Sequence, residues 1–228
     1  MAMVAGLVPF TSIDFPGLLA AVVFFQGCPL RCPFCHNPDL QENDGQGEMS
    51  WAEVISFLKS RKGKLDGVVF SGGEPLMQPD IVALAQEVKA LGFKVGIHTS
   101  GVYPDKLREM VSYLDWVGLD VKAPWNKYDT LSGRSNMAAK VQESLRFLLE
   151  REIAFEARTT CDPRNLVPQD ILVIAQDLKK LGVKTYALQK YRTFDADQNP
   201  PAPSAINSFF MPENLAPIQT LFPKVILR

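Results

Sequence analysis

Residues 80–94 read DIVALAQEVKALGFK and residues 170–184 read DILVIAQDLKKLGVK, so the two stretches are identical at eight of fifteen positions. In each, apolar residues recur at helical spacing up to a glycine, Gly92 or Gly182, and an apolar run follows. Glycine suits the left-handed residue that ends a helix. Each stretch therefore predicts a helix that leads into a buried strand.

The same alternation extends along the chain. Short runs rich in Val, Ile and Phe predict buried strands at 20–25, 67–71, 93–99, 116–121, 154–160 and 183–188. Helical patterns lie between these runs, and the first begins at Ser50, which forms a capping box with Glu53. This alternation predicts an α/β fold with a parallel sheet, either barrel-like or doubly wound. In such folds the chemistry lies at the C-terminal ends of the strands.

The composition excludes several classes of protein. In the 228 residues, 24 Lys and Arg balance 25 Asp and Glu for a net charge of −1, which argues against nucleic-acid binding. No run approaches the ~20 apolar residues that span a bilayer. The first residues have no basic segment and reach Pro9 early, so we expect no signal peptide and a cytoplasmic location. No linker divides the chain, so a single domain over 1–228 is expected.

Three of the four cysteines lie in one short segment, at Cys28, Cys32 and Cys35, with the spacing C-x3-C-x2-C. A reducing cytoplasm argues against disulfides, so these thiols predict metal binding. A [4Fe–4S] cluster held by only three thiolates leaves one iron open to substrate. The alternative is a zinc site formed by the three cysteines and His36. Cys161 lies far from this segment, and we interpret it as a buried structural residue.

The residues around the cysteines carry a family resemblance. With Phe34 in the aromatic position, the segment resembles the C-x3-C-x-aromatic-C signature of the radical S-adenosylmethionine (SAM) superfamily. The sequences SIDFPG at 12–17, FFQG at 24–27 and HN at 36–37 resemble those of glycyl-radical enzyme activating proteins. Among these the chain is most similar to the anaerobic ribonucleoside-triphosphate reductase activating type.

The resemblance runs from about Val4 to Tyr191, and it implies a fold and a chemistry. The implied fold is a single-domain partial (β/α)6 TIM-like barrel of the radical SAM type, with a core over 4–191 and a C-terminal extension over 192–228. The implied cofactors are a [4Fe–4S] cluster on the three cysteines and SAM, which chelates the fourth iron. One electron cleaves SAM to methionine and a 5′-deoxyadenosyl radical, which abstracts hydrogen from the substrate.

The implied substrate is another protein. An activating enzyme removes the Cα hydrogen of a glycine in a partner glycyl-radical enzyme, and it needs a one-electron donor such as flavodoxin or ferredoxin. An alternative is a radical SAM enzyme that acts on a small molecule or a peptide. A non-catalytic iron–sulfur or zinc module is a third hypothesis, and SAM cleavage by the purified protein would separate it from the other two.

Two strand ends carry further candidate residues. Gly72, Gly73 and Glu74 follow the strand at 67–71, and on their own they would predict a turn before proline. In this context they resemble the GGE motif that holds the amino group of SAM. Thr99 and Ser100 end the next strand, and we expect them at the cofactor as well.

The later strands add an acidic and two basic residues. Asp120 and Lys122 lie on one face of a strand, which predicts either a structural salt bridge or, by resemblance, contacts to the ribose and carboxylate of SAM. Arg158 matches a basic position near that carboxylate. Gln189 is a candidate substitute for a histidine that relatives place near SAM. His98 stands where pyruvate formate-lyase activators have an acidic cation ligand, and we interpret it as a hydrogen-bonded histidine at a strand end.

Overall fold

The structure is a computed structural model, and it describes residues 2–42, 47–192 and 199–228. Its strands are β1 (Val4–Thr11), β2 (Ala20–Phe25), β3 (Gly67–Gly72), β4 (Lys94–Thr99), β5 (Trp116–Asp120), β6 (Phe155–Cys161), β7 (Thr185–Lys190) and β8 (Lys224–Leu227). Its α-helices are α1 (Trp51–Ser60), α2 (Ile81–Ala90), α3 (Pro104–Met110), α4 (Trp125–Ser132), α5 (Met137–Glu150), α6 (Pro168–Leu181), α7 (Pro203–Ser208) and α8 (Pro212–Gln219). Short 3-10 helices are η1 (Pro38–Leu40), η2 (Pro75–Met77) and η3 (Val111–Tyr113).

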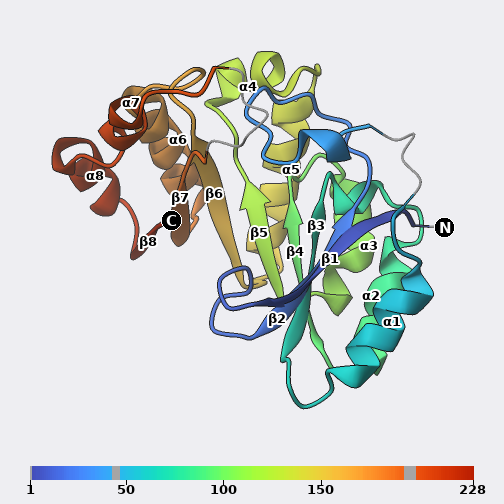
Figure 1. The fold of residues 1–228 in the computed structure, drawn as a ribbon. Coiled ribbons are helices and arrows are strands. Elements are labelled where there is room, and N and C mark those ends of the chain that lie inside the picture. Colours follow the sequence, from blue (N-terminus) through green and yellow to red (C-terminus); the bar gives the residue numbers. More distant parts are fainter. Residues whose placement is uncertain (1, 43–46, 193–198) are drawn as a thin grey trace.

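One sheet organises the molecule. Its strands follow the chain in the order β1 to β8; β1 runs antiparallel to β2, and every later neighbour pairs in parallel. Helices pack outside the curved sheet, with α1 and α2 at one side and α6 to α8 at the other, while β1 crosses in front (Figure 1). In the described chain no pairing joins β1 to β8, so the barrel stays open between these two strands.

The predicted alternation of strands and helices is confirmed. The six expected strands are β2 to β7, and their observed bounds lie within two residues of the expected ones. The predicted capping box at Ser50 and Glu53 is present. Gly92 and Gly182 follow their helices with φ of +94° and +98°, in the left-handed region that favours glycine.

Two strands lie beyond the six that were expected. β1 precedes them, and β8 follows the expected core boundary at residue 191 and pairs with β7. Residues 193–198 of the expected extension lie outside the described residues. In the described part of the chain, no helix is both long and apolar enough to cross a membrane.

The loop between β1 and β2 closes the interior of the barrel at the N-terminal ends of the parallel strands. Phe15 is 4% exposed, and its ring stacks on Trp116 with ring centroids 5.8 Å apart. A Cβ atom at Gly67 or Gly96 would lie 3.1 or 3.2 Å from the Phe15 ring, so glycine at these strand positions makes room for it. The large core lies between the sheet and the helices. Phe15 closes one end of the barrel, and the other end, where the parallel strands have their C-termini, is open for a site.

Candidate active site

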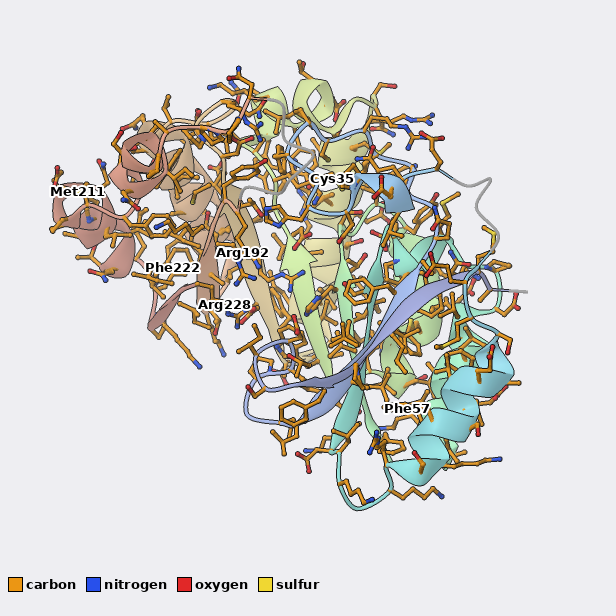
Figure 2. The ribbon with its side chains drawn as sticks, viewed as in Figure 1. Cys35, Phe57, Arg192, Met211, Phe222 and Arg228 are labelled. Carbon is orange, nitrogen blue, oxygen red and sulfur yellow. The ribbon has the colours of Figure 1, made fainter. Side chains whose placement is uncertain are left out.

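A cavity of about 300 Å³ lies at the C-terminal ends of the parallel strands. It is lined by twelve of the thirteen residues that the sequence singled out: Cys28, Cys32, Phe34, Cys35, Gly72, Gly73, Thr99, Ser100, Asp120, Lys122, Arg158 and Gln189. Figure 2 labels Cys35 and Arg228 on the wall of this cavity, and Met211 and Phe57 far from it. The remaining candidate, Glu74, is buried behind the wall.

The three neighbouring cysteines are free thiols on a loop that follows β2. The N–H of Cys28 donates to the carbonyl of Gln41 at 3.1 Å, and that of Cys35 donates to the carbonyl of Cys32 at 3.2 Å. Burial, with a smaller effect of the Glu74 carboxylate, raises the pKa of Cys28 to about 12, and burial also raises the pKa of Cys32. Bound metal would therefore be needed to hold the sulfurs of Cys28 and Cys32 as thiolates at neutral pH.

The donor set fits an iron–sulfur cluster. Soft thiolates are the ligands such clusters take, and all three candidates face one cavity. Among the described residues, no group of three or more His, Cys, Asp or Glu side chains is arranged around a single metal ion. A cluster binds its thiolates at separate irons and does not need that arrangement. The fourth cysteine, Cys161, is fully buried at the end of β6 and does not line the cavity, as predicted.

Glutamine side chains hold the start of the cysteine loop. The Gln26 amide donates to the carbonyls of Asp39 and Glu42, each at 2.9 Å, so it ties the two ends of the loop together. The Gln78 amide donates to the Gln26 carbonyl at 2.7 Å. Gln26 and Gln78 are 8% and 2% exposed, so these hydrogen bonds are protected from water.

Asp120 pairs with two cations at the end of β5. Its carboxylate accepts hydrogen bonds from Arg158 at 2.7 and 2.9 Å and from Lys122 at 3.2 Å. Burial alone would raise the pKa of Asp120, but the charges of Arg158 and Lys122 hold it below its usual range. Burial would lower the pKa of Lys122, and Asp120 and the nearby thiols raise it instead. Asp120 and Lys122 face the same cavity, although β5 ends at Asp120 and Lys122 lies just beyond the strand that was expected to carry both, and both remain charged at neutral pH.

The position of Arg158 depends on a glycine that the sequence did not single out as a site residue. Arg158 is 5% exposed and crosses β5 to reach Asp120. A Cβ atom at Gly118 would lie 2.7 Å from its guanidinium carbon, so any other residue at 118 would displace Arg158. Gly118 therefore decides where this cation lies in the cavity wall.

The Glu74 carboxylate is fully buried and accepts four hydrogen bonds from the protein. One oxygen accepts from the N–H of Leu76 at 3.1 Å and from the Thr99 hydroxyl at 2.7 Å. The other accepts from the N–H of Ser100 at 2.8 Å and from the Ser100 hydroxyl. Burial raises the pKa of Glu74, and these donors oppose that effect. The contact between this carboxylate and the amino group of SAM stays a prediction.

Gly72 and Gly73 lie against the chain that leads into the cysteine loop. Cβ atoms there would lie 2.3 Å from the nitrogen of Phe25 and 2.2 Å from the carbonyl oxygen of Gly27. The N–H of Gly73 donates to the Phe25 carbonyl at 2.9 Å, and that of Glu74 donates to the Gly27 carbonyl at 2.8 Å. The two glycines thus allow β3 to approach the segment just before Cys28.

His98 is the hydrogen-bonded histidine at a strand end that the sequence predicted. Its Nε2 lies 3.0 Å from the carbonyl oxygen of Asp14, and its Nδ1 lies 3.5 Å from the Ser71 hydroxyl. Burial and the charge of Arg158 lower the pKa of His98 to about 3, so the ring is neutral at physiological pH. A neutral ring that donates from Nε2 to the Asp14 carbonyl joins the cavity to the loop between β1 and β2.

The cavity also includes residues from both open edges of the sheet. Ile13 and Asp14 come from the loop after β1, while Lys190, Arg192 and Arg228 come from the ends of β7 and β8. Sequence reasoning did not assign these five residues to the site, because no local pattern shows that the loop after β1 and the ends of β7 and β8 line one cavity. The apolar run before Arg228 is a signal for a last strand, although its four residues are too short for a firm prediction.

Comparison with known proteins supports the family resemblance. The Radical SAM superfamily profile matches residues 22–161. A Methanocaldococcus jannaschii protein with a provisional name as a glycyl-radical enzyme activating enzyme is 32% identical over 205 residues, which are 86% of this chain and 82% of that protein. The pyruvate formate-lyase-activating enzyme of Clostridium pasteurianum is 39% identical over 115 residues, which are 48% of each chain.

The fold also matches solved structures. Streptococcus suis SuiB bound to S-adenosylmethionine superposes with a TM-score of 0.68 at 14% identity. The match covers 89% of this chain and 48% of SuiB, so this chain spans about half the length of that protein. This likeness establishes the architecture, because the identity is too low to carry a function with it.

Proposed function

Because this chain belongs to the radical SAM superfamily, and within it to the glycyl-radical enzyme activating enzymes, we propose that it activates a partner glycyl-radical enzyme by removing a glycine Cα hydrogen. Enzymes of this family use a [4Fe–4S] cluster and SAM. When bound, the two together supply a one-electron reductive cleavage that provides the hydrogen-abstracting species. The protein's part is to bind, orient and enclose them.

In this proposal, each wall of the cavity has its own task. Cys28, Cys32 and Cys35 hold the cluster, since they are the thiols that face the cavity. Lys122 and Arg158 provide fixed positive charge for a carboxylate, and Asp120 keeps them in place through its three hydrogen bonds.

The other candidates complete the cofactor site. Phe34 lies beside Lys122, whose Nζ is 6.0 Å from the ring centroid. Gly72, Gly73, Thr99 and Ser100 present small side chains and main-chain groups where β3 and β4 end, and Gln189 presents an amide at the end of β7. Small groups at the first two strand ends leave room for a ligand beside the cysteine loop.

One observation carries the proposal furthest: three thiols of one loop and the C-terminal ends of the parallel strands line a single cavity, while the fourth thiol is buried elsewhere. A fourth cysteine ligand would leave no iron open for SAM. Three such ligands leave one open, which is what the family's chemistry requires.

The cysteines can be tested by iron content. We expect about four irons per chain in anaerobically reconstituted protein, because a [4Fe–4S] cluster contains four. Cys28→Ala, Cys32→Ala and Cys35→Ala should each lose the cluster. Cys161→Ala is the matched control and should keep it, because this residue lies outside the cavity. Stoichiometric zinc with no iron uptake would favour the zinc alternative.

For the partner, we propose anaerobic ribonucleoside-triphosphate reductase, which the residues around the cysteine loop favour. The reconstituted protein, SAM and a strong one-electron reductant should produce a carbon-centred radical in that enzyme, observed by electron paramagnetic resonance. With the partner's glycine deuterated at Cα, deuterium should appear in 5′-deoxyadenosine. Pyruvate formate-lyase serves as the comparison partner. SAM cleavage that yields no radical in either protein, yet accompanies turnover of a small molecule, would support the small-molecule alternative.

A further inference from the structure

The Glu74 carboxylate differs from the other candidates in that no part of it lines the cavity. It is fully buried, and its two oxygens accept four hydrogen bonds. A carboxylate offers about four acceptor positions, so the protein already satisfies this one. A ligand amino group would have to displace a protein donor in order to reach it.

Ser100 lies between this carboxylate and the cavity. It is 6% exposed and lines the cavity wall, and both its N–H and its hydroxyl donate to Glu74. A hydroxyl has one proton to donate and two lone pairs to accept with. Since the Ser100 proton is used by Glu74, any hydrogen bond from Ser100 Oγ to a ligand in the cavity must be one that it accepts.

Thr99 is held in the same way but has less to offer a ligand. Its hydroxyl donates to Glu74 at 2.7 Å and accepts from the N–H of Gly101 at 3.0 Å. The Glu74 carboxylate fixes the end of β4 through its hydrogen bonds from Thr99 and Ser100. The backbone N–H of Glu74 also donates to the carbonyl of Gly27, at the start of the cysteine loop. One residue thus sets the spacing between the loop and the end of β4.

We propose that Glu74 is a positioning residue that acts through Ser100, turning the Ser100 hydroxyl into an acceptor for an N–H of the amino group of the ligand in the cavity. This inference rests on the proposed function, in which that ligand is SAM. It predicts that the carboxylate itself makes no contact with SAM. The effect of changing Glu74 on SAM binding should then disappear when the Ser100 hydroxyl is absent.

The test is a double-mutant cycle on the reconstituted protein, with SAM affinity measured by equilibrium dialysis without reductant or partner. In Glu74→Gln, an amide N–H directed at Ser100 frees the serine proton to point at the ligand, so SAM affinity should fall about tenfold or more. Ser100→Ala removes the acceptor and should cause a similar loss. The double variant should bind SAM no more weakly than either single variant.

Two additional arms make the result specific. The 2-oxo analogue of SAM, in which a carbonyl replaces the amino group, has no N–H to donate to Ser100 and should bind the variants no more weakly than it binds the unmodified protein. Asp170→Asn is the matched control, because it removes a carboxylate that is only 8% exposed but lies away from the cavity; it should bind SAM normally. Iron content and melting temperature report whether each variant folds and loads its cluster.

The outcomes separate this inference from the proposed function. Losses that add in the double variant would mean that Glu74 contacts SAM directly, and the inference would be wrong. Normal SAM binding by Ser100→Ala would also overturn it, even if Glu74→Gln fails to fold. If the unmodified protein binds its cluster but not SAM, the proposed function fails instead.

Discussion

Some side chains in this protein fix the positions of neighbouring side chains, and Asp120 is the main example. Asp120 binds Arg158 and Lys122 at once, so it acts as a shared counter-ion for two cations of the cavity wall. Removing it would leave the buried Arg158 without its counter-ion and close to the partly buried Lys122, and breaking a buried ion pair typically costs about 3 to 5 kcal/mol. The sequence left two readings of this residue, a salt bridge or a ligand contact. The geometry shows the salt bridge, which is compatible with a role toward a ligand.

The neutral state of His98 makes stability depend on pH. Its pKa is lowered to about 3 in the folded protein, against about 6.5 in an unfolded chain. Below pH 6.5 His98 is therefore protonated in the unfolded chain but stays neutral in the folded protein until the pH approaches 3. The contribution of His98 is complete above pH 6.5 and falls by at most about 1.4 kcal/mol per pH unit as the pH drops toward 3.

We expect His98→Gln to flatten this dependence. Arg158, Asp120 and Arg228 are the charged groups that act on His98, and they remain in the variant. The measurement is the free energy of unfolding in urea at pH 7.5, 6.5 and 5.5. Between pH 7.5 and 6.5 the slopes of the two proteins should differ less than between pH 6.5 and 5.5, because the unfolded histidine is only half protonated at pH 6.5. An unchanged slope between pH 6.5 and 5.5 would mean that His98 has the same pKa in the folded protein as in the unfolded chain.

At the scale of elements, the loop between β1 and β2 is a structural part of the barrel. Phe15 fills the interior beneath Gly67 and Gly96 and stacks on Trp116. Phe15→Ala should lower the free energy of unfolding by about 3 kcal/mol or more, because it empties a packed site. Phe10→Ala is the matched control: Phe10 is 56% exposed on the neighbouring strand, and its loss should cost less than about 0.5 kcal/mol. Similar losses in a urea titration would contradict this packing.

The elements also show what the sequence can and cannot predict. Strands β2 to β7 were predictable because they are buried on both faces and read as apolar runs. Strand β1 was missed because Pro9 and Gly6 interrupt its pattern, and β8 because it is four residues long. The cysteine loop was predictable from its spacing. The burial of Glu74 was not, since a motif does not tell where a side chain points.

At the scale of the whole molecule, β8 ties the C-terminal segment to the barrel. The Arg228 guanidinium binds the buried carboxylate of Glu156 on β6 at 2.6 and 3.1 Å, and the N–H of Lys190 donates to the Arg228 carbonyl. Phe222 packs on Tyr186 of β7 with ring centroids 5.3 Å apart. These contacts favour one cooperative unit that includes the C-terminal segment.

We therefore expect Arg228→Met to destabilise the whole molecule by about 2 to 3 kcal/mol, since it leaves the Glu156 charge buried without its partner. Unfolding followed by tryptophan fluorescence and by circular dichroism should stay coincident. Lys180→Met, which removes an exposed ion pair with Asp177, should have almost no effect. Two separate transitions in the unmodified protein would show that the C-terminal segment unfolds on its own.

The open barrel has a consequence for how copies of this chain behave in concentrated solution. Apart from Val4, which forms a bridge with Met49, the outer edge of β1 has no strand partner in the described part of the chain, and it carries the exposed side chains of Val8 and Phe10, a combination that invites edge-to-edge aggregation. Two irregularities interrupt its pairing with β2, one between Val4 and Gly6 and one between Val8 and Thr11, and Pro9 lies in the second. Proline has no N–H to donate and a bulge twists the strand, so a flat intermolecular sheet cannot extend along this edge. We therefore expect the irregularities that hid β1 from sequence analysis to oppose edge-to-edge association of copies of this chain.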